Sequence, residues 1–235
     1  MAGTHGVKRP GGSALNAGQV GATRAAEYIA NRYGTDEPDE LSPQAFDGLS
    51  KAAAAVAALG QSPRGTVTPG EALEEIRERM TRFGAHLRSR KGAAGALAAA
   101  KTQYARLREE GVALSSASEV PDAVTTLQQC LTQIAMLKAI CLMFERGVGS
   151  RGSHCILDES GIEMHPGLVD PETDGPYRFL SENEELRKTV LLVSYDEAAG
   201  DLFTGRDLPV RPIPTRDIAF EPAWTEYREG KIFEI

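Results

Sequence analysis

The feature that most constrains this fold is an apolar seam in residues 69–87. Its large apolar side chains recur at alternating spacings of three and four, namely Leu73, Ile76, Met80, Phe83 and Leu87. That spacing indicates an amphipathic, coiled-coil-like helix. Thr68 and Glu71 have the spacing of a capping box, and Pro69 suits the first helical position. The segment therefore predicts a helix that buries one face against other helices.

Two further amphipathic helices are predicted downstream, at residues 93–109 and 120–146. The first has an apolar face of Leu97, Ala100, Tyr104 and Leu107, and the second has one of Leu127, Leu131, Ile134, Leu137, Ile140, Cys141 and Phe144. Three such helices with short connections favour an antiparallel three-helix bundle, which we assign to residues 68–158. Gly147 and Gly149 are expected to end the last helix.

The N-terminal segment "GTHGVKRPGGSALNAGQVGATRAAEYIANRY" reads as a glycine-rich loop followed by a helix at residues 13–33. Ser13 is the expected cap and Gly34 the expected stop. The apolar stripe of this helix comprises Leu15, Val20, Ala25, Tyr28 and Ile29. An alanine-rich helix is predicted at 43–59, entered at Pro43 and followed by a linker rich in glycine and proline.

The chain changes character after residue 150, where glycine and proline become frequent and no period is visible. The segment 189–196 predicts a strand, and "DLFTGRDL" after a short turn predicts its hairpin partner. Four prolines between residues 209 and 222 indicate an extended tail. The expected fold is therefore mainly α (α+β). Its expected parts are a glycine-rich loop and helix at 1–34, a helix and linker at 35–67, the bundle at 68–158 and an irregular segment with a hairpin at 159–235.

Composition narrows the classes of partner. The chain has 235 residues and a net charge of −7, which disfavours nucleic-acid binding because phosphate neutralisation needs clustered cations. We expect no direct membrane insertion, since no apolar run approaches the length of a span. The three cysteines have no metal-ligand spacing, and no metal site is expected. Without a secretory pattern at the start, free thiols and a cytoplasmic location are the expectation.

The glycine-rich loop has the chemistry of an anion site. Glycines at positions 3, 6, 11 and 12 allow close backbone approach to a flat ligand. The helix start after them offers unpaired N–H groups and the positive end of the helix dipole, and Lys8 and Arg9 add charge. A phosphate, a carboxylate or the edge of a reduced flavin would suit it. On spacing alone, a plain glycine-rich turn before a surface helix fits as well.

Three segments resemble the succinate dehydrogenase/fumarate reductase flavoprotein family, which includes L-aspartate oxidase. The first is "THGVKRPGGSAL" followed by "RAAEYIA", which is similar to the family's "HGANRLGGNSL…GRAA". The second is "EEIRERMTRFGAHLRS", which is similar to the first helix of the family's C-terminal helical domain. The third is "FERGVGSRGSH", similar to "SRGAH". The order and approximate spacing of all three agree with the family.

The resemblance implies an FAD site that is shared with another chain. It implies that Arg9 lies near the flavin and binds a substrate carboxylate. His5 is a further candidate for substrate binding, although we favour a loop histidine that makes one backbone hydrogen bond. The resemblance also implies that the flavin lies against the backbone of the helix start, with N–H groups near Ala14 and Leu15 facing its pyrimidine edge. The candidate cofactor residues are Gly11, Gly12, Ser13, Ala14 and Leu15.

The sequence also departs from the family pattern. Lys8 replaces an asparagine, and Ser13-Ala14-Leu15 replaces the family's "NSL", so a hydroxyl next to the flavin is lost. The N-terminal strand–GxGxxG–helix for the ADP half of FAD and the capping domain are both missing. The expectation is therefore a C-terminal subunit of a split enzyme, or a truncated reading frame, that is inactive alone.

The expected function follows from these matches and absences. The expected partner is a flavoprotein chain that carries the nucleotide-binding and capping domains, and an iron–sulfur or other electron-transfer subunit is a further candidate. The substrate would be a small carboxylate. The alternative is a non-catalytic helical module, derived from such an enzyme, that serves in assembly. For Arg151 and His154 we favour a structural role over a place in the active site.

Overall fold

The computed structural model describes residues 11–33, 42–59, 65–152, 154–170, 174–210, 224–226 and 228–231. The chain divides into two compact units, Met1–Ser42 with Arg211–Ile235, and Pro43–Val210. The fold is mainly α with a few small sheets, as the sequence predicts.

The helices and helical turns are α1 (Gly11–Tyr33), α2 (Pro43–Leu59), α3 (Pro69–Arg79), η1 (Met80–Gly84), α4 (Arg90–Glu110), η2 (Ala117–Glu119), α5 (Val120–Arg146) and η3 (Glu184–Lys188). The strands are β1 (Leu87–Ser89), β2 (Cys155–Glu163), β3 (Val169–Asp170), β4 (Gly175–Pro176), β5 (Arg178–Phe179), β6 (Thr189–Tyr195) and β7 (Phe203–Pro209).

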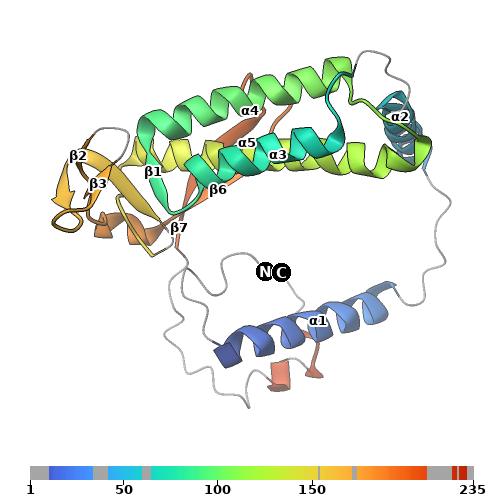
Figure 1. The fold of residues 1–235 in the computed structure, drawn as a ribbon. Helices are drawn as coiled ribbons and strands as arrows, with labels where there is room; N and C mark the ends of the chain where they lie inside the picture. The colour runs from blue at the N-terminus through green and yellow to red at the C-terminus, as the bar shows by residue number, and fades with distance from the viewer. Residues whose placement is uncertain are drawn as a thin grey trace. The chain divides into compact units, whose positions relative to one another are not determined.

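The second unit is built on α3, α4 and α5, which lie side by side (Figure 1). α4 runs antiparallel to α5, since Arg90 contacts Phe144 at one end while Gln103 contacts Gln133 further along. α3 begins with the predicted capping box. The Thr68 side chain accepts the N–H of Glu71, and the Glu71 carboxylate accepts the N–H of Thr68 at 2.8 Å. Short connections thus bring three amphipathic faces together.

The predicted apolar seam does not stay helical to its end. The α-helix stops at Arg79, a π-helical turn covers Met80–Gly84, and Leu87 lies in β1 with 42% of its surface exposed. Glycine at position 84 weakens the helix there, and the chain turns at Ala85. Ser89 then caps α4 by accepting the N–H of Gly92 at 3.1 Å, so this helix begins three residues earlier than predicted.

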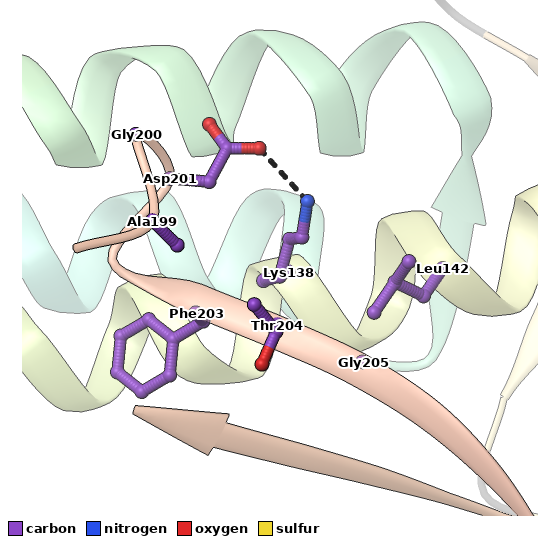
Figure 2. Close-up of a pocket in the computed structure, with 8 residues that line it drawn as sticks. All are labelled: Lys138, Leu142, Ala199, Gly200, Asp201, Phe203, Thr204 and Gly205. Atoms are coloured by element: carbon purple, nitrogen blue, oxygen red, sulfur yellow. Dashed lines mark hydrogen bonds and ion pairs between the residues drawn. The ribbon is translucent and has the colours of Figure 1, made fainter. Parts of the chain in front are cut away.

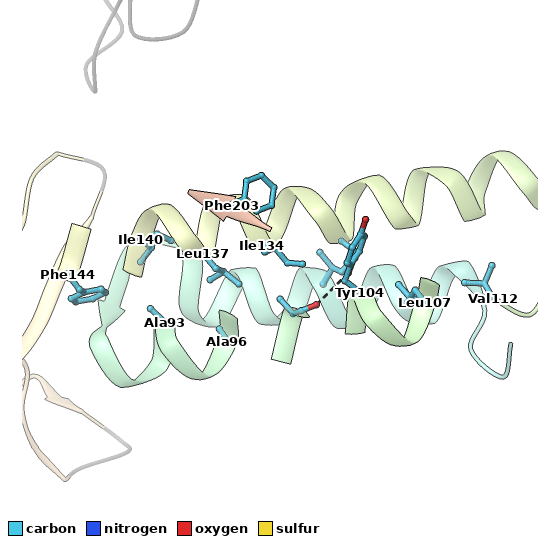
Figure 3. Packing of buried hydrophobic residues seen from close by; sticks show 14 of the residues in the cluster. Ala93, Ala96, Tyr104, Leu107, Val112, Ile134, Leu137, Ile140, Phe144 and Phe203 are labelled. Carbon is cyan, nitrogen blue, oxygen red and sulfur yellow. Dashed lines mark hydrogen bonds between the residues drawn. The ribbon is translucent and has the colours of Figure 1, made fainter. Parts of the chain in front are cut away.

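The core lies between the three helices and is closed by the hairpin (Figure 3). Between Ala93 and Ala100, α4 buries only alanines, whereas α5 buries Ile134, Leu137 and Ile140, so the two helices can approach closely there. Figure 3 also places Phe203 of β7 against the α5 side of this cluster. The most buried members include Ala93, Ala96, Ala100, Leu107, Cys130, Ile134 and Leu137.

The strands of the described residues form three small sheets. β1 pairs parallel with β2, and β2 pairs antiparallel with β5. β3 pairs with β4, and β6 pairs with β7 in the predicted hairpin. The pairings of β1 through β5 were missed because these strands are short or carry no regular alternation, and their partners are distant in sequence. β2 crosses the domain boundary that we expected at residues 158 and 159.

Among the described residues, Ala117–Arg146 is long and apolar enough to cross a membrane by length and composition alone. We had expected no run of that kind. α3, α4 and the hairpin all pack on this helix. Its buried face also carries Thr126 and Gln133, which are hydrogen-bonded. These are the features of a core helix, and weak evidence for a span.

Candidate functional site

The candidate cofactor residues lie in the first turns of α1. Gly11, Gly12 and Ser13 are helical, which corrects the prediction that the loop continues to Gly12 and that Ser13 caps the helix. A cap residue has non-helical backbone angles, and Ser13 does not meet that condition. His5 and Arg9, the expected substrate ligands, lie outside the described residues, so the structure does not bring them together with the helix start.

The helix start retains part of the predicted chemistry. In a helix that includes Gly11, the N–H of Leu15 faces the carbonyl of Gly11, so it is not available to a ligand. The N–H of Ala14 lies before the first N–H that has an i−4 carbonyl within α1. A Cβ built on Gly11 or Gly12 would meet no heavy atom within 4 Å, so packing among the described residues does not require glycine at either position.

The apolar stripe of α1 is largely uncovered. Leu15 is 67% exposed and Ile29 is 58% exposed, although both belong to the predicted buried face. Val20 and Tyr33 are more than half exposed as well, while Ala14 is buried. α2, which belongs to the other unit, likewise exposes Phe46 and Leu49. Leu15, Ile29 and Tyr33 share one side of α1, and exposed apolar surface of this kind marks sites of protein–protein contact.

The SRGSH segment holds the end of α5 to the following strands. The N–H of Ser150 donates to the carbonyl of Leu180 at 3.0 Å, and its hydroxyl accepts the N–H of Ile156 at 2.8 Å. Arg151 forms an ion pair with Glu182, Nε to Oε1, at 3.1 Å. Burial, and next the charge of Arg88, lower the pKa of His154 and so favour its neutral ring. These contacts are structural.

The same segment contains a G-x-G-x-x-G spacing at Gly147, Gly149 and Gly152. All three glycines have positive φ values. The segment follows helix α5 and leads into strand β2, whereas a dinucleotide-binding loop follows a strand and opens a helix. The backbone N–H groups here therefore lack the helix start that phosphate binding uses.

Arginines at the bundle end cap helix carbonyls. Arg88 donates from Nε to the carbonyl of Ala85 at 2.7 Å and from Nη2 to that of Gly84 at 3.0 Å. Arg90 donates from Nη2 to the carbonyl of Phe144 at 2.6 Å. Cations at helix C-termini satisfy unpaired carbonyls and the helix dipole. This basic cluster is therefore explained by the fold.

Sequence reasoning missed one charged cluster beside an open hollow (Figure 2). Lys101 of α4 and Lys138 of α5 both pair with Asp201, in the turn between β6 and β7. The Lys138 Nζ to Asp201 Oδ2 distance is 2.9 Å. The side-chain hydrogen bonds from Lys101 and Lys138 lower the pKa of Asp201 to about 2. The cluster fastens the hairpin to the helices.

We expect Asp201→Asn to lower the free energy of unfolding by about 1 kcal/mol at low salt. The pKa shift alone indicates more, but the side chain is 47% exposed and solvent screens the pairs. Because the folded-state pKa is depressed, this contribution is present above pH 4 and is lost as the pH falls toward about 2.

Urea unfolding at pH 7 and pH 3, in low and in high salt, measures the effect. Glu197→Gln is the matched control, because Glu197 is an exposed carboxylate near the same turn. A difference between wild type and Asp201→Asn that is the same at both pH values would contradict the assignment.

No group of three or more histidine, cysteine or acidic residues that could hold a metal ion occurs within the described ranges. The three cysteines are free thiols, and Cys130 is fully buried. Burial raises the pKa of the Cys130 thiol and that of Cys141, which disfavours the reactive thiolate.

Comparisons of the chain with protein-family models, with curated proteins and with solved structures found no match. The resemblance to the flavoprotein family therefore stays a prediction that rests on the quoted segments.

Proposed function

We propose that this chain is the C-terminal subunit or segment of an FAD-dependent oxidoreductase of the succinate dehydrogenase/fumarate reductase type. It completes a flavin and carboxylate site together with a partner chain that carries the nucleotide-binding and capping domains. An iron–sulfur or other electron-transfer subunit is a further partner in this proposal, and the complex acts in the cytoplasm.

The observation that carries the proposal is the uncovered apolar face of α1. This helix contains the end of the motif segment and exposes Leu15, Ile29 and Tyr33 on one side. It also belongs to a different compact unit from the bundle. A helix with such a face gains stability only by packing on another surface. A helix that completes the domain of a partner chain would have this character.

The start of α1 fits the flavin end of the cofactor. Gly11 and Gly12 leave open space at the first turn, where a planar ring could lie close to the backbone. When bound, FAD would exchange electrons with the carboxylate substrate. The chain's own contribution would be the guanidinium of Arg9, which binds the carboxylate, and the first N–H groups of α1, which face the ring. The ADP end would be held by the partner.

The second candidate function is a non-catalytic assembly module. The exposed face of α2 favours it, because a helix in the other unit also presents Phe46, Leu49 and Val56. Docking surfaces alone require no flavin. The presence or absence of bound flavin in the assembled pair therefore separates the two candidates.

We expect the isolated chain to bind no FAD and the co-expressed pair to hold it stoichiometrically. The partner to co-express is a chain with a strand–GxGxxG–helix segment that co-purifies with this one. Ile29→Asp should weaken the affinity of the pair at least about thirtyfold. It replaces a buried apolar side chain, which contributes about 2 kcal/mol to association, with a charged one. The variant pair should also lose its flavin. Flavin absorbance and sedimentation measure both quantities.

Matched variants keep assembly and chemistry apart. Asn31→Asp introduces the same charge two residues away, on the opposite side of α1, and should leave assembly unchanged. Arg9→Ala should leave assembly and flavin content intact but lower turnover at least about tenfold, since a charge-assisted hydrogen bond is lost. An assembled pair without flavin would leave the assembly module as the function. Yellow flavin on the isolated chain would contradict the shared site.

A further inference from the structure

A polar cluster crosses the apolar core where α3, α4 and α5 meet. Arg79 Nη1 donates to Oε1 of Gln103 at 2.7 Å and to Oε1 of Gln133 at 2.8 Å. Gln133 Nε2 donates to Gln103 Oε1 at 2.9 Å, and Gln103 Nε2 donates to the carbonyl of Ala72 at 3.0 Å. Each of the three helices supplies one member. We call Arg79, Gln103 and Gln133 the core triad.

The triad is buried, but its counter-charge lies at the rim of the core. Gln103 and Gln133 are each 2% exposed, and the Arg79 side chain is 9% exposed. Arg79 Nη2 pairs with Glu75 Oε1 at 2.5 Å, and the other oxygen of Glu75 accepts from Arg106 at 3.0 Å. Burying such a pair seldom stabilises a protein relative to apolar side chains of similar volume. A role other than stability is therefore the better explanation.

Apolar packing leaves the position of α3 weakly specified. The helix has 11 residues, and its buried residues are Pro69, Ala72 and Ile76. Its hydrogen bonds to α4 run through the polar side chains of Gln103 and Arg106. A slide of α3 by one turn, about 5.4 Å, would therefore displace only two large apolar side chains of this helix, Ile76 and the partly buried Leu73.

The triad does not tolerate such a slide. In a one-turn shift, Glu75 or Phe83 would take the place of Arg79 opposite the two glutamines. The carboxylate of Glu75 would then face the same Oε1 atoms that accept from Arg79, and buried amides would lose their partners. Only the observed register satisfies the arginine and both glutamines together.

We propose that the core triad fixes the register and rotation of α3 on α4 and α5, and that it contributes packing specificity rather than stability. A single buried polar contact can act in this way in helical assemblies. The inference goes beyond the proposed function and is independent of flavin binding. The sequence signal is a glutamine in apolar phase on each of two helices.

The test removes all three members at once, as Arg79→Met, Gln103→Leu and Gln133→Leu in the full chain. Spin labels at Glu78→Cys of α3 and Gln128→Cys of α5 report the register through their distance distribution. Both positions are exposed, and Cys141→Ala with Cys155→Ser removes the other accessible thiols, while Cys130 is fully buried. The parent should give one narrow distance.

The triple variant should keep its helical content and its melting temperature but give a second distance population, displaced by up to about 5 Å. Ile76→Val removes part of the apolar contact of α3 and should keep the single distance. An unchanged single distance in the triple variant would overturn the proposal. Loss of folding would overturn it as well, because the triad would then supply stability.

Discussion

Gly149→Ala should lower the free energy of unfolding by about 3 kcal/mol or more, through backbone strain and a steric clash. Gly149 has a φ of +72°, and a Cβ there would lie 2.0 Å from the carbonyl oxygen of Ser181. Backbone cannot move aside as a side chain can. The shift would break the bonds from Ser150 N–H to Leu180 and from Asn183 N–H to Val148.

Gly147→Ala is the matched control for this effect. Its φ of +67° is nearly the same, but a Cβ there would meet no atom within 4 Å. It should therefore show only the cost of a left-handed residue, about 1 kcal/mol. Chemical denaturation of both variants measures the difference. Equal destabilisation would mean that the close approach to Ser181 has no part in stability.

Leu137→Ala should lower the free energy of unfolding by about 3 kcal/mol, because it leaves a cavity that the core cannot fill. Leu137 is fully buried and lies among residues from α4 and α5 (Figure 3). Met136→Ala on the same helix should change stability by less than about 0.5 kcal/mol, since Met136 is 51% exposed.

Thermal or chemical unfolding of this pair of variants also tests the membrane question raised by α5. In a core helix, only the inward side chains carry packing energy. A larger effect from Met136→Ala than from Leu137→Ala would contradict the packing of α5 on α4. It would favour an α5 that buries its other face in another environment.

Substitutions on the proposed partner surface and in the core should affect different properties, namely assembly and the stability of the bundle. Ile29→Asp changes a face that is exposed in the isolated chain, so it should leave the stability of the bundle intact. Leu137→Ala should weaken the bundle and leave the α1 surface unchanged. Comparing the two variants shows whether a loss of flavin in the pair comes from assembly or from a destabilised fold.

The sequence by itself determined the helices and the hairpin. Apolar periodicity, a capping box and glycine stops depend on residues that are near in sequence. These local signals placed α2, α5 and the hairpin of β6 and β7 close to their observed bounds, and they placed the start of α3 at Pro69. The motif at residues 5–15 likewise comes from sequence alone, and it is the source of the flavin hypothesis.

Tertiary structure alone decided what depends on distant contacts. β1 and β2 pair across more than sixty residues, and Lys101, Lys138 and Asp201 converge from three elements. Gln103 and Gln133 stand at apolar positions of their helices, and only the packed structure supplies the arginine that satisfies both. The exposure of Leu15 belongs here too: an apolar period predicts a buried face, but burial requires a surface that covers it, and the neighbours of Leu15 in the fold leave it uncovered.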